Sequence, residues 1–94
     1  MNRLEWSWKA RLDIIQIYNY IIEDSLYYSI KTVKEIREEV EDLKRFPYIG
    51  RKVPEYDIYN IRELIYKSYR IIYEIKSNEI LIRRIWHSSR LLSK

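Results

Sequence analysis

The sequence predicts an α+β fold with the order β-α-α-β-β-β, in which an N-terminal helical hairpin packs on a twisted antiparallel sheet. Two observations support this prediction. Apolar residues recur at helical spacing in the first half of the chain, whereas β-branched and aromatic residues dominate from position 60 onward. A chain of 94 residues has room for one hydrophobic core, so we expect a single domain over residues 1–94.

The first predicted elements are a short strand and a helix. Residues 3–8 alternate loosely, with Leu4, Trp6 and Trp8 on one side, which is typical of a strand. A helix follows from Ser7 or Trp8, and it carries an apolar stripe that we expect to be buried. The stripe consists of Leu12, Ile15, Tyr18 or Asn19, and Ile22.

A second helix is predicted to begin after Ser25, whose hydroxyl suits an N-cap. Its apolar stripe consists of Leu26, Ile30, Val33, Ile36 or Arg37, Val40 and Leu43. Its other face is charged and contains Lys34, Glu35, Glu38, Glu39, Glu41 and Asp42. Because each stripe must be buried against another element, the two helices are expected to form a hairpin.

A loop separates the helices from the remaining strands. Phe46 precedes a proline and is therefore pushed out of the helical region of backbone space, which ends the second helix. Residues 47–55 hold the only glycine, Gly50, and both prolines, Pro47 and Pro54. Three antiparallel strands are predicted beyond this loop, over residues 61–66, 69–75 and 80–86.

Ser77 and Asn78 predict a two-residue hairpin turn, which sets the register of the last two strands. A regular ladder from this turn pairs Arg70 with Ile85 and Ser68 with His87. The face expected under the helices then carries Tyr69, Ile71, Tyr73, Ile75, Ile80, Ile82, Arg84 and Trp86. The exposed face carries Arg70, Ile72, Glu74, Leu81, Arg83, Ile85 and His87.

The composition excludes several classes of site. The chain has no cysteine, so it cannot hold a disulfide, a thiolate zinc site or a cysteine nucleophile. Its single histidine, His87, cannot form a multi-histidine metal site, and we expect neither metal nor cofactor. The longest uncharged run, residues 14–22, is too short to span a bilayer, so we expect a cytosolic protein without membrane contact.

Positive charge is concentrated in the last third of the chain. The formal net charge is +4, but residues 1–60 carry ten Lys and Arg against eleven Asp and Glu. Residues 61–94 carry eight Lys and Arg against three Glu, a net charge of +5. This asymmetry favours a polyanion or a ribonucleoprotein as partner, although the same abundance of Ile, Lys, Glu, Arg and Tyr is typical of thermophile proteins.

The predicted register gathers residues that could act on a phosphodiester. Arg70 and His87 share the exposed face with Arg83, and Glu55 in the loop could act as a base. Such a set suits RNA cleavage without a metal, because one group removes the 2′-hydroxyl proton, another protonates the leaving oxygen and arginine stabilises the developing charge. The alternative is that these arginines only form solvated cross-strand pairs. A basic functional face is predicted from Arg62, Arg83 and Arg90.

Several short motifs, in order along the chain, resemble those of the RelE/ParE superfamily of toxin–antitoxin toxins. The N-terminal part of the pattern consists of Trp6, Ala10, Asp13 and Ile15. The rest consists of Phe46-Pro47-x-x-Gly50-Arg51-x-Val53-Pro54-Glu55, Arg62-Glu63-Leu64, Tyr69-Arg70-Ile71-x-Tyr73, Ile80-x-Ile82 and Ile85-x-His87-x-x-Arg90. The resemblance implies a compact toxin that a cognate antitoxin wraps with a segment that folds on binding, giving a toxin–antitoxin hetero-oligomer.

The superfamily implies two mechanisms. The loop with Gly50, Arg51 and Pro54 and the ending His87-x-x-Arg90 look most like the ParE branch, which poisons DNA gyrase and would not be enzymatic. The positions of Glu55, Arg70 and His87 also resemble those used by YoeB-type nucleases of the RelE branch, which cleave mRNA on the ribosome. The chain lacks the lysine-rich face and late tyrosine of RelE enzymes. A ParE-like toxin is therefore the first prediction, an mRNA endonuclease the alternative, and an inactive binding module a third possibility.

Overall fold

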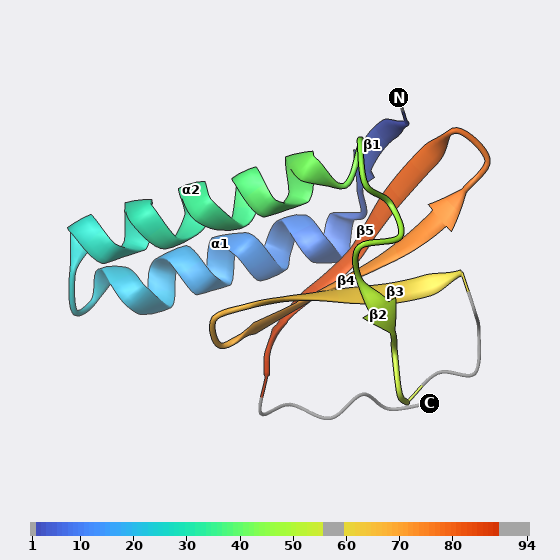
Figure 1. Cartoon of the computed structure of the whole chain (residues 1–94). Coiled ribbons are helices and arrows are strands. Elements are labelled where there is room, and N and C mark those ends of the chain that lie inside the picture. The colour runs from blue at the N-terminus through green and yellow to red at the C-terminus, as the bar shows by residue number, and fades with distance from the viewer. Residues whose placement is uncertain (1, 56–59, 89–94) are drawn as a thin grey trace.

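The structure, a computed structural model, describes residues 2–55 and 60–88 and forms two helices beside one sheet (Figure 1). Its elements are β1 Arg3–Trp6, α1 Trp8–Ile22, α2 Leu26–Asp42, β2 Arg51–Lys52, β3 Ile61–Tyr66, β4 Tyr69–Lys76 and β5 Glu79–His87. This order confirms the predicted α+β fold, and it adds β2, a two-residue strand inside the predicted loop.

The five strands form one mixed sheet in the order β1-β5-β4-β3-β2. β1 pairs parallel to β5, with Arg3 opposite Glu79 and Trp6 opposite Ile82, whereas the other neighbours are antiparallel. The N-terminal strand therefore extends the sheet beyond its last strand. The sheet is mixed rather than purely antiparallel for this reason alone.

Side-chain hydroxyls cap both helices at the residues where the sequence predicts that they begin. The Ser7 hydroxyl accepts a hydrogen bond from the Ala10 amide, and the Ser25 hydroxyl accepts one from the Tyr28 amide. Each cap satisfies an amide that has no partner within its own helix. Neither helix in the described part of the chain is long and apolar enough to cross a membrane.

The main core lies between the sheet and the sheet-proximal half of the helical hairpin. Its buried residues are Ala10, Ile14, Ile36, Val40, Leu43, Ile71, Tyr73, Ile80, Ile82 and Ile85. The connection between the helices projects away from the sheet, so the distal half of the hairpin has little to pack on (Figure 1). A second, smaller cluster of Val53, Ile61 and Ile72 lies apart from the main core, with Trp86 packed against it. Its members Ile72 and Trp86 belong to the outer face of the sheet, the face turned away from the helices.

The predicted apolar stripe of α1 is exposed, which corrects the sequence prediction. Leu12, Ile15 and Ile22 are exposed to solvent, whereas Ala10 and Ile14 face the core. Helical periodicity did not select the right face because apolar residues occur around most of this helix. The prediction for α2 is right only in its C-terminal half, since Leu26 and Ile30 are also exposed.

The last hairpin begins in the predicted register and then leaves it at a β-bulge. Lys76 pairs with Glu79 and the turn residue Asn78 has φ 60°, as the turn prediction requires. The register shifts between Ile72 and Tyr73, so that Arg83 is an extra residue in β5. Beyond the bulge the pairs are Ile71 with Ile85, Arg70 with Trp86, and Tyr69 with His87.

The bulge exchanges the two faces of β5 beyond Arg83. Ile85 turns into the core and Trp86 turns to the outer face, opposite to the prediction. Ser7 contacts β5 at this bulge. Its amide donates to the Ile82 carbonyl at 2.9 Å, and its hydroxyl donates to the Arg83 carbonyl at 2.8 Å. These two bonds hold the bulged strand at the point where β1 ends and α1 begins.

Candidate functional site

The loop over residues 47–55 runs along the edge of the sheet, where its β2 pairs with β3, and it is held by the buried Tyr73. The Tyr73 hydroxyl accepts a hydrogen bond from the Gly50 amide at 2.9 Å and donates one to the Pro47 carbonyl at 2.7 Å. Burial raises the pKa of Tyr73, so the hydroxyl stays protonated and remains a donor. One core tyrosine from β4 thus fixes two positions of the loop.

Gly50 is required at this position by space rather than by backbone conformation. A Cβ atom there would lie 2.6 Å from the Glu63 carbonyl oxygen and 2.6 Å from the Tyr73 hydroxyl. The Gly50 carbonyl also accepts a hydrogen bond from the Arg62 guanidinium at 2.8 Å. Arg62 in turn lies over the Tyr48 ring, 5.0 Å from its centre. The predicted loop motif is therefore an anchored turn pressed against β3.

A chain of four charged residues continues along the outer face. Arg70 forms a two-pronged pair with Glu55, with nitrogen–oxygen distances of 2.9 and 2.8 Å. Its Nε donates to Glu63 at 2.6 Å, and the other oxygen of Glu63 accepts from Arg51 at 2.6 Å. Arg70 and Glu63 are only 5% and 1% exposed. The charges of this chain alternate, so each of the two buried members, Arg70 and Glu63, contacts two residues of opposite charge.

We call this network of Arg51, Glu55, Glu63 and Arg70 the clamp. Hydrogen bonding to Glu55 is the largest effect on the pKa of Arg70 and raises it, so the guanidinium stays charged. Both carboxylate oxygens of Glu55 accept hydrogen bonds from that guanidinium. Pro54 is exposed beside it, at the end of the anchored turn.

His87 lies away from the clamp. It is exposed at the end of β5, opposite Tyr69, and the two rings meet edge to face with their centres 5.9 Å apart. Since side chains alternate along β4, Tyr69 and Arg70 point to opposite faces of the sheet. The structure therefore brings Glu55 and Arg70 together but not Arg70 and His87, contrary to the predicted register. His87 instead lines a cavity of about 640 Å³ that also involves Gln16 and Tyr20 of α1.

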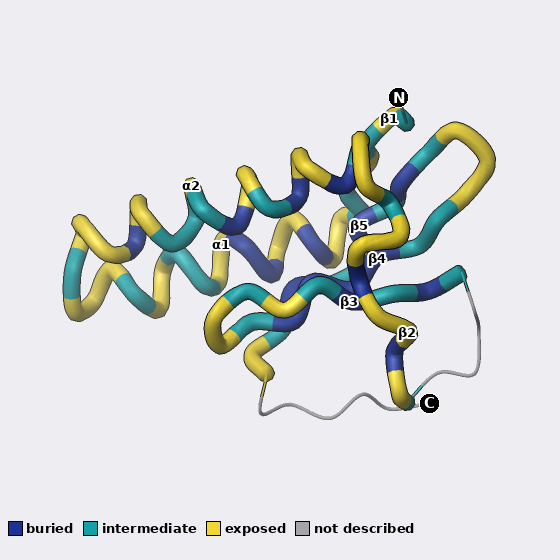
Figure 2. The backbone as a smooth tube through the Cα atoms, in the orientation of Figure 1, coloured by how far each residue is buried: buried dark blue, intermediate teal, exposed yellow. Residues whose placement is uncertain are grey.

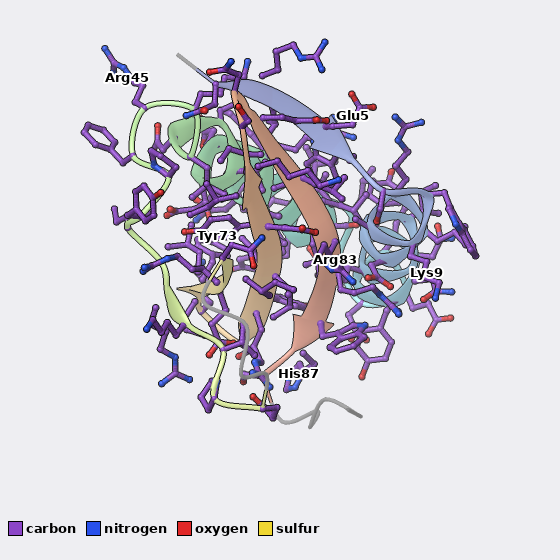
Figure 3. All side chains as sticks on the ribbon, turned by 90° about the vertical axis from the view of Figure 1, so that its right-hand side faces the viewer. Glu5, Lys9, Arg45, Tyr73, Arg83 and His87 are labelled. Atoms are coloured by element: carbon purple, nitrogen blue, oxygen red, sulfur yellow. The ribbon has the colours of Figure 1, made fainter. Side chains whose placement is uncertain are left out.

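Arg83 and Arg84 belong to a separate part of the outer face, next to the start of α1. Arg83 donates to Glu74 at 2.8 Å (labelled in Figure 3, midway along β5). Arg84 forms a two-pronged pair with the buried Asp13 at 2.8 and 3.0 Å, and its guanidinium lies 4.4 Å from the centre of the Trp86 ring. Both arginines line a shallow cavity of about 310 Å³ together with Trp8 and Lys9.

Of the predicted basic face, Arg62, Arg83 and Arg90, the structure describes Arg62 and Arg83, and Arg83 pairs with a carboxylate. Arg70, Arg83 and Arg84 each contact a carboxylate, as the distances above show. Arg62 is directed at the Gly50 carbonyl and the Tyr48 ring, so it supports the loop. Arg90, the third predicted member of this face, lies outside the described residues. The three arginines of β4 and β5 are therefore engaged with carboxylates of the same chain.

Sequence reasoning included two buried acids, Asp13 and Glu63, only as members of family motifs and predicted no role for either. Asp13 pairs with Arg84 and also accepts the Ile85 amide at 2.9 Å, which caps the free edge of β5 beyond β1. The partner of Asp13 could have been inferred from Arg84. This cation was predicted to lie under the helices, and a buried cation requires an acid nearby. The pairing of Glu63 could not be predicted, since its two arginine partners come from β2 in the loop and from the neighbouring strand β4. No group of His, Asp and Glu within the described ranges is arranged to hold a metal ion.

Comparison with known proteins places this arrangement in a family. Residues 4–92 match the family described as ParE toxin of type II toxin–antitoxin system, parDE. No curated protein sequence matches significantly. A solved chain of the chromosomal ParDE toxin–antitoxin system from P. aeruginosa is 27% identical with a TM-score of 0.78, covering 93% of this chain and 96% of that one.

Two further solved structures share the fold at lower identity. The RelBE2 toxin–antitoxin complex from Mycobacterium tuberculosis is 19% identical with a TM-score of 0.67, covering 92% of this chain and 96% of that one. The YoeB dimer from Staphylococcus aureus is 22% identical with a TM-score of 0.63, covering 92% and 95%. The match to the family extends over nearly the whole chain and includes the loop, the clamp and the bulged strand. The chain therefore belongs to the ParE toxin family of type II toxin–antitoxin systems, within the RelE/ParE superfamily.

Proposed function

We propose that this toxin acts as a ParE-like poison of DNA gyrase and that it does so by binding rather than by catalysis. The observation that carries the proposal is the separation of the residues a nuclease would need. Glu55 is clamped by Arg70 on the outer face, and His87 lies across the sheet beside Tyr69. The 27% identity to a chain of a ParDE system supports the same branch.

The loop offers the surface through which such a toxin could contact its target. Phe46, Tyr48, Ile49 and Arg51 are exposed at its start, while Tyr73 and Gly50 hold the backbone beneath them. Large apolar side chains presented by an anchored loop cost little entropy to order on binding. We therefore propose the segment 46–51 as the part of the toxin that contacts gyrase.

Purified gyrase and supercoiled plasmid test this proposal. The toxin, made by cell-free synthesis, should cause gyrase to accumulate cleaved DNA. Ile49→Ser should weaken the effect about tenfold, a loss typical of one buried apolar contact, whereas the matched change Ile15→Ser on α1 should leave it unchanged. Unaltered supercoiling without cleaved DNA would exclude gyrase poisoning, and equal effects of the two variants would exclude the loop.

Ribosome-dependent cleavage of mRNA is the second candidate. The direct pairing of Glu55 with Arg70 favours it, because two of the three predicted catalytic residues lie in contact. Primer extension on a translated message would then detect cuts in phase with codons, and Glu55→Ala and His87→Ala would abolish them. Intact message during growth arrest would rule this candidate out. An inactive binding module would leave growth, message and plasmid unaffected.

We also propose that the cognate antitoxin covers the exposed stripe of α1. Trp8, Leu12, Ile15 and Ile22 lie on one side of this helix and are exposed, with Lys9 and Arg11 beside them. An amphipathic segment with acidic flanks is the chemistry that matches this face. Leu12→Asp with Ile15→Asp should abolish co-purification with the product of the adjacent gene. Gln16→Asp on the same helix should not, and retention by the double variant would place the contact elsewhere.

A further inference from the structure

The outer side of α2 carries a second unpartnered surface, distinct from the stripe of α1. Tyr27, Ile30, Lys34, Glu38 and Glu41 recur every three or four residues and are all exposed. They lie opposite the buried side of the helix, and exposed positions follow the length of α2 in Figure 2. A groove of about 730 Å³ borders this side of the helix.

The charges on this surface are placed unfavourably with respect to the dipole of the helix. Both lysines, Lys31 and Lys34, lie in the N-terminal half, whereas Glu38, Glu41 and Asp42 lie in the C-terminal half. The amide dipoles of a helix favour negative charge at its start and positive charge at its end. The distribution in α2 is the reverse, with no acid in its first turn and no base in its last.

Within the helix, Lys31 interacts electrostatically with Glu35, whose pKa it helps to lower. A lysine four residues before a glutamate is the weaker orientation for a pair within a helix. In the described part of the chain, Lys31, Lys34 and Glu38 make no ion pair. Glu41 contacts only Lys44, at 2.9 Å. The surface charges of α2 are therefore available to something that packs alongside.

We propose that the outer side of α2 binds a second copy of this chain, with the two helices antiparallel. If the two-fold axis crosses at the level of Ile36, Lys34 lies level with Glu38 of the second copy, because each is two residues from Ile36. Lys31 and Glu41 are likewise each five residues away. The four charged positions are thus complementary across a two-fold axis, as a two-fold interface requires. Antiparallel packing also opposes the two helix dipoles.

The ends of the same interface supply apolar and aromatic contact. Leu26 and Tyr27 are exposed at the N-terminal end of α2, ten and nine residues before Ile36. The positions symmetric to them, Phe46 and Arg45, lie beyond the end of α2 at Asp42. An unrelated partner would have no reason to match positions symmetric about Ile36. The proposal concerns self-association and does not depend on which target the toxin attacks.

Charge reversal tests the proposal on the full chain. The wild-type protein should sediment as a dimer at about 100 µM in 50 mM salt and should dissociate more readily in 1 M salt. Lys31→Glu with Lys34→Glu should raise the dissociation constant at least about tenfold, and Glu38→Lys with Glu41→Lys should do the same. An equimolar mixture of the two double variants should restore the dimer, because every pair becomes opposite in sign again.

Controls separate this interface from general effects of charge. Lys9→Glu with Lys76→Glu reverses two exposed lysines elsewhere and should leave the dimer intact. Circular dichroism should give the same helix content for all variants. A monomeric wild-type chain, a dimer that survives either reversal, or a mixture that stays monomeric would overturn the proposal. A lysine-dependent complex with the adjacent gene product in place of a dimer would also overturn it.

Discussion

At the scale of single residues, the loop depends on a core tyrosine. The sequence predicts only that the ring of Tyr73 packs in the core, and this ring is fully buried. Its hydroxyl contributes more, since it bonds to both Gly50 and Pro47. This role could not be predicted, because it requires knowing where a loop 23 residues earlier in the chain is placed. The spacing of β-strand residues identifies a buried ring but not the partner of its polar atom.

Tyr73→Phe tests this anchor. The ring still fills the core, but the buried Gly50 amide loses its acceptor, so we expect the free energy of unfolding to fall by about 1–3 kcal/mol. Tyr20→Phe, at an exposed position, should change it by less than about 0.5 kcal/mol. Denaturant titration measures both. Equal stability of wild type and Tyr73→Phe would mean that the hydroxyl does not hold the loop.

At the scale of elements, the predicted order of helices and strands is right, and the faces of two elements are wrong. To predict which face of α1 is buried, one must know that the hairpin extends beyond the sheet. Local periodicity does not contain this information. To predict the faces of β5, one must know of the bulge at Arg83. The contacts at that bulge come from Ser7, at the other end of the chain. Arg70 and Glu55 were predicted as neighbours on the outer face, and His87 was misplaced by one register step.

Disulfide trapping tests the register beyond the bulge, and the absence of native cysteine makes the experiment unambiguous. Tyr69→Cys with His87→Cys should oxidise to an intramolecular disulfide, because these residues are directly opposite. Ser68→Cys with His87→Cys corresponds to a hairpin without a bulge and should oxidise more slowly. Mass spectrometry of alkylated protein gives both rates. Faster closure of the second pair would contradict the bulge.

A contact between α2 and the turn after β3 predicts a dependence of stability on pH. Glu35 accepts hydrogen bonds from the Tyr66 hydroxyl and from Lys67, the latter at 3.4 Å. The bond from Tyr66, foremost, lowers the pKa of Glu35 below its usual value of 4.5, so the folded state favours the carboxylate. The resulting stabilisation is present above about pH 4.5 and is lost as the pH falls through the lowered pKa.

Glu35→Gln should therefore melt at a lower temperature than wild type at pH 7, and the two should converge near pH 3. Glu39→Gln on the same helix is the matched control and should show no such convergence. Thermal melts across this range provide the measurement. A difference between wild type and Glu35→Gln that grows as the pH falls would refute the contact.

At the scale of the whole molecule, internal pairing decides what the positive charge can do. The excess in the last third of the chain predicts a basic face, yet Glu55, Glu63, Glu74 and Asp13 neutralise the arginines of β4 and β5. Composition gives the amount of charge but not its partners. Among the described residues, exposed large apolar side chains gather on α1, on the N-terminal half of α2 and on the anchored loop. Such surfaces support the proposal that the toxin acts by binding proteins.

The most direct test of this account examines plasmid topology and message integrity in the same cells after the toxin is expressed without its antitoxin. Poisoning of gyrase predicts cleaved or relaxed plasmid, while translated messages remain intact. His87→Ala should retain this effect, since His87 lies away from the Glu55–Arg70 clamp. Codon-phased cuts in messages from cells whose plasmid stays supercoiled, lost on His87→Ala, would contradict the account.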